Sequence, residues 1–260
     1  MTTENLFDLS GKVALVTGGA QGMGRMIAEG LVRAGAHVYI TSRKPDLCMA
    51  TARELSAFGR CTALPADLVT PEACTALAGQ FRSHERALHI LVNNAGKTWG
   101  APLASFPDKA WAGVMAVNVQ TPFTLVRDLL PELKNAARPA DPARVINIGS
   151  LAGSAVEPLS AYSYAASKAA VHHLSRVLAA DLAGFHITVN AVVPGYFPTQ
   201  MTSHIRADES AAQALEARVP LRRLGAADDI AGTCIFLASR AAAYITGAEI
   251  PVDGGMSGCR

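Results

Sequence analysis

A short apolar run that leads directly into a glycine-rich turn and a helical pattern constrains this chain more than any other segment. Residues 13–16 read Val-Ala-Leu-Val, which is typical of a buried strand, and residues 17–24 read Thr-Gly-Gly-Ala-Gln-Gly-Met-Gly. The apolar residues that follow at the spacing of one helix face are Ile27, Leu31 and Ala34. A helix N-terminus presents unpaired N–H groups and the positive end of a dipole, and glycines let the backbone approach a pyrophosphate closely. The segment therefore predicts a nucleotide-phosphate site, although its glycine spacing differs from Gly-x-Gly-x-x-Gly and a purely structural turn is the alternative.

Further short apolar runs alternate with helical patterns along the chain. They cover residues 37–41, 61–64, 90–92, 145–148, 187–193 and 250–252. Such alternation predicts an α/β fold, a doubly wound parallel sheet with helices on both faces. At 260 residues the chain fits a single domain, which we expect to span 1–260 with an ordered core from about 10 to 258. Ligands of such folds bind beyond the carboxyl ends of the strands, where the strand order reverses.

Tyr164 and Lys168 stand four residues apart in an Ala-rich helical pattern, so both side chains should lie on one helix face. A cation ~5 Å from a phenol, at an effective dielectric of ~20, contributes roughly 3 kcal/mol and lowers a pKa near 10 by about two units. The pair therefore predicts a phenol that can give or take a proton near neutral pH. The alternative is a chance pair on an exposed helix.

Composition excludes several classes of protein. Half of the residues are hydrophobic, yet no apolar run approaches the ~20 residues of a membrane span, and residues 1–10 lack the pattern of a signal peptide. We therefore expect a soluble, cytoplasmic protein. A net charge of +2 gives no reason to expect nucleic acid or a membrane surface as a partner. The five cysteines lack metal-ligand spacing and the adjacent His172 and His173 diverge on a helix, so we expect no metal; one histidine should be packed and the other at an interface.

The glycine turn and the Tyr-x-x-x-Lys pair occur with further motifs in a fixed order. These are Asn93-Asn94-Ala95-Gly96, Asn118 in Val-Asn-Val, Asn147-Ile148-Gly149-Ser150, Pro194-Gly195 and Asp253-Gly254-Gly255. Together they resemble the short-chain dehydrogenase/reductase family over essentially the whole chain. The resemblance implies a Rossmann fold, hydride transfer between a nicotinamide cofactor and a carbonyl or alcohol substrate, and a homotetramer.

The resemblance also assigns catalytic roles. Tyr164 is the expected acid/base and Ser150 hydrogen-bonds the reacting oxygen, while Lys168 lowers the pKa of the tyrosine and holds the nicotinamide ribose. Asn118 is the expected fourth member, holding a water that links Lys168 to solvent. An ordinary buried, hydrogen-bonded asparagine is the alternative for Asn118.

The segment Ser42-Arg43-Lys44 favours NADP(H) as the cofactor. NAD-preferring relatives usually place an Asp here, whereas Arg43 or Lys44 can pair with a 2′-phosphate. Against this, Gln21 stands where many NADP-dependent relatives carry a second basic residue, and Arg43 with Lys44 could be a solvated loop end. The expected cofactor-binding residues are Gly18, Gln21, Gly22, Met23, Gly24, Ser42, Arg43, Lys44, Asp67, Leu68, Asn94, Ala95, Gly96, Tyr164, Lys168, Pro194, Gly195, Phe197 and Thr199.

The substrate is inferred from the resemblance alone. Residues 161–176, 194–199 and 219–225 look most similar to bacterial 3-oxoacyl reductases, including the rhamnolipid-biosynthesis type, so the leading activity is NADPH-dependent reduction of a 3-oxoacyl thioester. Reductases of fatty-acid synthesis typically carry an Arg where this chain has Ala179-Ala180-Asp181, which puts delivery by acyl carrier protein in doubt. A sugar-acid or small-alcohol dehydrogenase is the alternative enzyme, and a non-catalytic dinucleotide sensor is the alternative of another class. Tyr162 is expected in the pocket wall, and residues 196–219 are expected to form a mobile cover or a fixed helix pair.

Overall fold

The computed structural model describes residues 6–157, 159–199 and 209–259. In these residues, parallel strands form one seven-stranded sheet in the order β3-β2-β1-β4-β5-β6-β7. The strand bounds are β1 Val13–Val16, β2 His37–Ile40, β3 Cys61–Ala63, β4 Ile90–Asn93, β5 Ala143–Ile148, β6 Ile187–Pro194 and β7 Glu249–Val252. Every predicted strand forms, with ends that differ from the prediction by at most two residues. The predicted doubly wound parallel sheet is confirmed.

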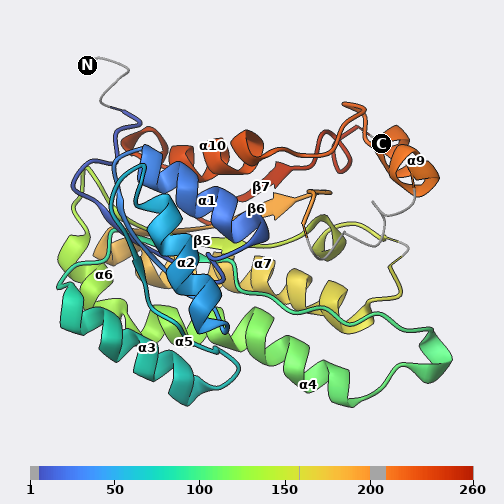
Figure 1. The fold of residues 1–260 in the computed structure, drawn as a ribbon, viewed down its shortest axis with the longest axis horizontal. Coiled ribbons are helices and arrows are strands. Elements are labelled where there is room, and N and C mark those ends of the chain that lie inside the picture. The colour runs from blue at the N-terminus through green and yellow to red at the C-terminus, as the bar shows by residue number, and fades with distance from the viewer. Residues whose placement is uncertain (1–5, 158, 200–208, 260) are drawn as a thin grey trace.

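Helices cover both faces of the sheet (Figure 1). One face carries α1, α2 and α10, which pack against residues of β1, β2, β4, β5 and β6, and the other face carries α3, α5, α6 and α7. The helix bounds are α1 Gly22–Arg33, α2 Pro45–Leu55, α3 Pro71–His84, α4 Lys109–Met115, α5 Thr121–Asp128, α6 Leu130–Ala136, α7 Tyr162–Leu182, α9 Glu209–Arg218 and α10 Ala227–Ala238. A single π-helical turn, Ala116–Gln120, joins α4 to α5. In the described residues, no helix is long and apolar enough to cross a membrane.

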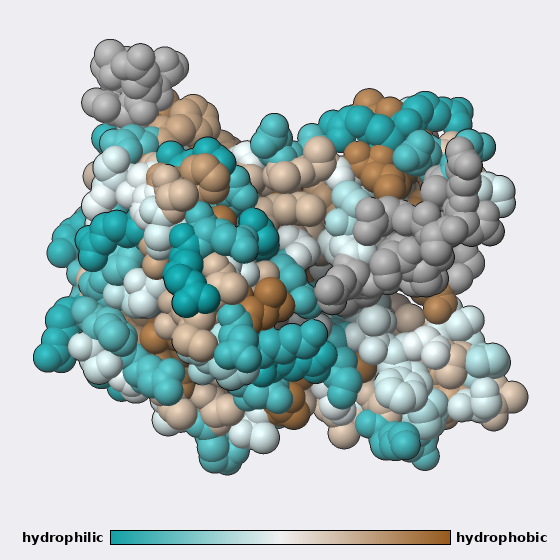
Figure 2. Space-filling view, in the orientation of Figure 1, coloured by the Kyte–Doolittle hydropathy of each residue, from teal (hydrophilic) through white to brown (hydrophobic). Residues whose placement is uncertain are grey.

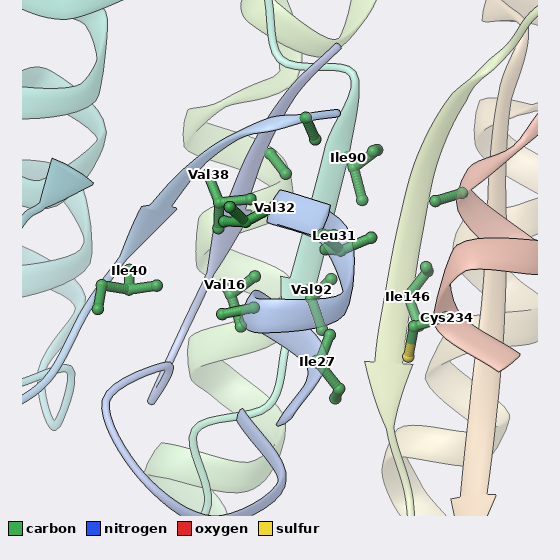
Figure 3. Packing of buried hydrophobic residues seen from close by; sticks show 14 of the residues in the cluster. Val16, Ile27, Leu31, Val32, Val38, Ile40, Ile90, Val92, Ile146 and Cys234 are labelled. Atoms are coloured by element: carbon green, nitrogen blue, oxygen red, sulfur yellow. The ribbon is translucent and has the colours of Figure 1, made fainter. Parts of the chain in front are cut away.

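The glycine turn sits where it does because α1 packs its apolar stripe on the sheet. Ile27 and Leu31 are fully buried against strand residues such as Val16 (Figure 3). Burying such side chains stabilises the fold by about 1.5–3 kcal/mol each. On the same face Ile146 of β5 meets Cys234 of α10. With α1 fixed in this way, its first turn lies at the carboxyl end of β1, where the strand order reverses between β1 and β4.

Candidate active site

The turns after β1 and β4 are joined through one buried hydroxyl. The Oγ1 of Thr17 donates to the carbonyl of Val92 at 3.3 Å and accepts from the backbone N–H groups of Asn94 and Ala95, each at 3.0 Å. The side-chain amide of Asn94 donates back to the Thr17 carbonyl at 2.9 Å. Thr17 is only 1% exposed, so this network fixes the two predicted cofactor turns against each other at the switch point of the sheet.

The glycine turn leaves no room for side chains at its closing position. Gly18 and Gly22 have φ values of 63° and 55°, in the left-handed region that favours glycine. A Cβ on Gly24 would lie 2.2 Å from the carbonyl oxygen of Gly18 and 2.4 Å from the side-chain nitrogen of Asn94. Gln21, which precedes α1, has an extended backbone and makes no capping hydrogen bond with its side chain. The first N–H groups of α1 are thus left for an anion, as the nucleotide-phosphate prediction requires.

The predicted adenosine end lies beyond β2 and β3. Arg43 and Lys44 are both exposed, and the Lys44 backbone N–H donates to Ser42 Oγ at 3.2 Å. Asp67 is exposed, whereas Leu68 is buried and its carbonyl accepts from Thr121 Oγ1 at 2.6 Å. The two cations therefore stand free of the core at the end of β2, where a charged group of a nucleotide could reach them.

Lys168 is buried beneath Tyr164 on α7. Its ammonium donates to the carbonyl of Ile148 at 2.7 Å and lies 5.6 Å from the centroid of the Tyr164 ring. Burial lowers the pKa of Lys168 to about 8. A Cβ on Gly96 would come within 3.9 Å of the same ammonium, which places the turn after β4 beside it.

The prediction that the pKa of Tyr164 is lowered is wrong for the protein without bound cofactor or substrate. Burial raises the pKa of Tyr164, and the hydrogen bond with Ser150 is what acts to lower it. The expected lowering by Lys168 is not among the influences on this pKa, and the loss of water around the phenol outweighs the effect of Ser150. The phenol is consequently protonated at neutral pH and can serve as a proton donor.

Ser150 follows β5 and begins the short 3₁₀ turn Leu151–Gly153. Its Oγ accepts from the Ala152 N–H at 3.2 Å, and its backbone N–H points to the ring of His172 at 3.3 Å. The Ser150 side chain acts to lower the pKa of Tyr164, so the structure brings these two predicted catalytic residues near each other.

Asn118 lies in the π-helical turn and is 2% exposed. Its Nδ2 donates to the Lys97 carbonyl at 2.9 Å and to Ser167 Oγ at 2.8 Å, and its Oδ1 accepts from the Lys97 N–H at 2.8 Å. Both amide hydrogens are used, so the side chain holds the turn after β4 against α7. Single π turns inside helices often occur at functional sites, because they widen the helix and free backbone carbonyls.

The expected nicotinamide side is formed by the segment after β6. Gly195 approaches Asp253 so closely that a Cβ would lie 2.9 Å from the aspartate backbone, and Phe197 is buried against Gly225. Thr199 lies across from Gly22, at 3.5 Å from the position of a Cβ there. Pro194 ends β6 in the sheet. The segment after β6 therefore faces the glycine turn. The contact of Phe197 and Thr199 with the nicotinamide amide stays a prediction.

Large apolar side chains lie on the segments that follow the Asn94–Gly96 turn and the Ser150 turn. Those that remain exposed on the segments leading to α4 and α7 are Trp99 at 40%, Leu103 at 73%, Val156 at 95% and Leu159 at 38%. The two segments touch where the Ala101 N–H donates to the Ser160 carbonyl at 3.1 Å. In Figure 2 the lobe before α4, at the lower right, is mostly pale or brown. Tyr162 stacks edge-on against Phe106 with ring centroids 5.3 Å apart, which fits its predicted place in a wall.

A cavity of about 280 Å³ lies next to the site, and none of the four predicted catalytic residues lines it. It lies between Tyr196, Phe197 and the turn Asp253–Gly255. The predicted cover falls partly outside the described residues, including Met201 and Ile205. Its described part includes α9, whose Leu215 is 7% exposed and therefore packed.

Sequence reasoning missed three polar groups that support the site. They are Thr17, the buried Asn93–Asn147–Ser175 chain with hydrogen bonds of 2.8 Å, and His172 behind Ser150. The signal for Thr17 and Asn147 was their position at strand ends, where polar residues interrupt apolar runs. For His172 the sequence predicted only that one of the two adjacent histidines, His172 or His173, is packed. That prediction is confirmed, since His172 is 3% exposed and His173 is exposed.

The chain is similar to known proteins over nearly its whole length. A family model described as Enoyl-(Acyl carrier protein) reductase matches residues 18–257. A rhamnolipids biosynthesis 3-oxoacyl-[acyl-carrier-protein] reductase from Pseudomonas aeruginosa is 49% identical over 249 residues, covering 96% of this chain and 97% of the relative. The chain belongs to the short-chain dehydrogenase/reductase family.

Solved members of this family superpose closely on the chain. The RhlG/NADP active-site complex of Pseudomonas aeruginosa has a TM-score of 0.95 and 48% identity, covering 97% of this chain and 99% of that one. A gluconate 5-dehydrogenase from Burkholderia cenocepacia in complex with NADP and tartrate has a TM-score of 0.91 and 31% identity, covering 98% and 99%. The predicted family and its oxidoreductase chemistry are confirmed.

Proposed function

We propose that the protein reduces a 3-oxoacyl thioester to the hydroxyacyl thioester with NADPH. The single observation that carries the proposal is the Ser150–Tyr164–Lys168 cluster, which stands beside a glycine turn that keeps an anion site open. The 3-oxoacyl reductase name of the relative that is 49% identical along nearly its whole length supports the substrate class.

The residues present fit NADP(H). The N–H groups at the start of α1 and the side-chain-free surface at Gly24 suit a pyrophosphate, and Arg43 with Lys44 suits a 2′-phosphate. Asp67, Leu68 and the Asn94–Gly96 turn would hold the adenosine half, and the 194–199 segment the nicotinamide amide. NADP in two solved relatives supports this assignment. When bound, the cofactor supplies the hydride that reaches the carbonyl carbon.

Side chains of the protein supply the proton for the carbonyl oxygen and stabilise the negative charge that develops during the reduction. Tyr164 donates its phenolic proton to the carbonyl oxygen, and its raised pKa keeps that proton in place at neutral pH. Ser150 donates a hydrogen bond to the same oxygen and stabilises the developing alkoxide. The ammonium of Lys168 stabilises the tyrosinate that remains and would hold the nicotinamide ribose, while Asn118 fixes the turn after β4 around that ammonium.

A sugar-acid dehydrogenase is the second candidate, because one of the solved relatives is a gluconate 5-dehydrogenase. The exposed apolar residues on the segments after Gly96 and Ser150 favour the acyl substrate. Trp99, Leu103 and Leu159 offer apolar surface to an acyl chain, whereas a sugar acid needs hydrogen-bond partners for each hydroxyl.

The proposal also covers the oligomeric state of the protein and whether a carrier protein delivers the substrate. The large apolar residues exposed on α4, α5 and α7, namely Trp111, Phe123 and Val177, support a homotetramer that uses these helices. Ala180 and Asp181 are exposed on α7 and offer no cation to an acidic carrier protein, which supports a free thioester as substrate. The lack of a membrane-spanning helix in the described residues is compatible with a cytoplasmic protein.

The test is NADPH consumption with a panel of 3-oxoacyl thioesters on coenzyme A and on acyl carrier protein, sugar acids and simple ketones, repeated with NADH. We expect the 3-oxoacyl thioesters to give the highest kcat/KM and Tyr164→Phe to lower it at least ~100-fold. Unchanged turnover in Tyr164→Phe contradicts the mechanism. NADPH binding without turnover of any carbonyl or alcohol would instead indicate a sensor.

A further inference from the structure

The imidazole of His172 is enclosed directly behind Ser150. Its Nε2 accepts from the Ser150 backbone N–H at 3.3 Å, and its Nδ1 lies 3.2 Å from Ser154 Oγ and 3.4 Å from a carboxylate oxygen of Glu249. His172 comes from α7, one turn after Lys168, and Glu249 begins β7. The ring therefore connects the backbone of the proposed catalytic serine to a helix and a strand at the centre of the site.

The loop that carries Ser150 is shaped around this ring. A Cβ on Gly149 would lie 2.1 Å from His172 Nε2, and a Cβ on Gly153 would lie 2.9 Å from Cε1 of the same ring. Neither glycine can carry a side chain while the imidazole stays in place. The two residues on either side of the Ser150–Ala152 stretch thus pack on one side chain, which fixes where the serine hydroxyl points.

The hydrogen bond from Ser150 defines the protonation state of the ring. Because the backbone N–H must donate, Nε2 is the acceptor and the ring proton resides on Nδ1, facing Ser154 and Glu249. A second proton, on Nε2, would set two N–H groups against each other and break this contact.

The charges around the ring act in both directions. Burial favours the neutral ring and is the largest influence lowering the pKa of His172. Lys168 and Arg176 on α7 also disfavour the cation, whereas Glu249 on β7 favours it. The Glu249 carboxylate is already held by Arg176 at 2.5 Å and by Ser154 Oγ at 3.3 Å, so its charge is largely engaged elsewhere. The neutral ring is the stable form near neutral pH.

We propose that His172 is a positioning residue for Ser150, whose neutral imidazole holds the serine loop in its reactive geometry and releases it on protonation. The inference rests on the proposed reduction chemistry. It does not place His172 in contact with the substrate: the ring acts through the Ser150 backbone. Oxidoreductase activity should then depend on an acceptor at Nε2 and should fall in acid, when that acceptor is lost.

Three variants of the full chain test this. His172→Leu removes the acceptor, His172→Gln places an amide oxygen near Nε2 without a titratable group, and His173→Leu is the control on the exposed neighbour. With NADPH and the best ketone of the panel, we expect His172→Leu to lower kcat about tenfold or more, with the Kd of NADPH changed less than about twofold. His172→Gln should regain most of kcat at neutral pH, and His173→Leu should match the wild type.

The pH profile separates positioning from mere packing. Because the pKa of His172 is lowered from the ordinary 6.5, the wild-type kcat should decline only on the acid side of that value, as His172 takes its second proton. The His172→Gln profile should stay flat over the same acid range. Wild-type kcat in His172→Leu, or the same acid decline in His172→Gln, overturns the inference. Should His172→Leu fail to fold by circular dichroism, the His172→Gln profile still decides. Absence of turnover in the wild type would instead contradict the proposed function itself.

Discussion

The ammonium of Lys168 lies 5.6 Å from the ring centroid of Tyr164 and donates a 2.7 Å hydrogen bond to the Ile148 carbonyl. The two buried groups therefore differ in which of them changes charge near neutral pH. Tyr164 keeps its proton because burial raises its pKa, and Lys168 is the group that titrates near neutral pH because burial lowers its pKa to about 8.

We therefore predict an alkaline decline in the reduction rate that belongs to Lys168. As pH rises through about 8, the lysine loses its proton and can no longer stabilise the tyrosinate that forms when Tyr164 donates. A profile of kcat against pH with saturating NADPH checks this. The His172→Gln variant is the control and should show the same alkaline limb. A rate that stays constant well above pH 8 contradicts the assignment.

Burial of Lys168 should also appear in the stability of the fold. Its folded pKa of about 8 lies below the ordinary 10.5, so between these values the unfolded chain binds more protons and the free energy of unfolding rises with pH. Below pH 8 the protonated lysine costs the fold on the order of 3 kcal/mol. Urea unfolding of the wild type and of Lys168→Met should be measured between pH 8 and 10.5. The free energy of unfolding of the wild type should rise with pH relative to that of the variant. A pH-independent difference between the two proteins would argue against a depressed pKa.

The strands of the sheet and the pairing of Tyr164 with Lys168 could be predicted from the sequence, for a physical reason. Strands buried on both faces are continuous apolar runs, and Tyr164 and Lys168 share a helix face by their spacing alone. The direction of the Tyr164 pKa could not be predicted, because spacing gives the distance to a charge and says nothing of desolvation. Nor could the links from His172 to Ser150 or from Tyr196 to Glu157, which join residues 22 and 39 positions apart through the folded chain.

Gly24 should tolerate no side chain. Its added Cβ would meet the carbonyl oxygen of Gly18 at 2.2 Å, and backbone cannot rotate aside as a side chain can. We expect Gly24→Ala to lower the free energy of unfolding by about 2 kcal/mol or more and to weaken NADPH binding strongly. Urea titration and fluorescence titration with NADPH measure the two effects. The matched control is Gly79→Ala in α3, where a Cβ meets nothing within 4 Å and should stabilise the helix by roughly 0.5–1 kcal/mol.

Arg43 and Lys44 should determine the choice between NADPH and NADH. Losing a charge-assisted contact to the 2′-phosphate costs about 1.5–3 kcal/mol, so Arg43→Ala should raise the KM for NADPH roughly tenfold to a hundredfold and leave that for NADH nearly unchanged. Lys44→Ala is the parallel variant that shows which cation carries the contact. Equal effects of Arg43→Ala on both cofactors would refute a 2′-phosphate role for Arg43.

Glu157 should connect the serine–tyrosine segment to α9. Its Oε2 accepts from the Tyr196 hydroxyl at 2.6 Å and from Arg218 at 2.9 Å, and its side chain is 2% exposed, whereas that of Arg218 is 39% exposed. Because one partner is buried, a double-mutant cycle of Glu157→Gln and Arg218→Met should give a coupling energy near 1 kcal/mol or above, measured by urea unfolding.

The same contact should affect the ketone more than the cofactor. Glu157 lies on the segment between Ser150 and Tyr164 and is joined to Arg218 of α9, so we expect Glu157→Gln to raise the KM of the ketone several-fold and leave the Kd of NADPH unchanged. The exposed pair Arg33–Glu29 on α1 provides the control cycle, for which about 0.3–0.5 kcal/mol is expected. If the Glu157–Arg218 coupling were no larger than that of the control pair, Glu157 would not hold α9 at the site, and the substrate KM should then be insensitive to its charge.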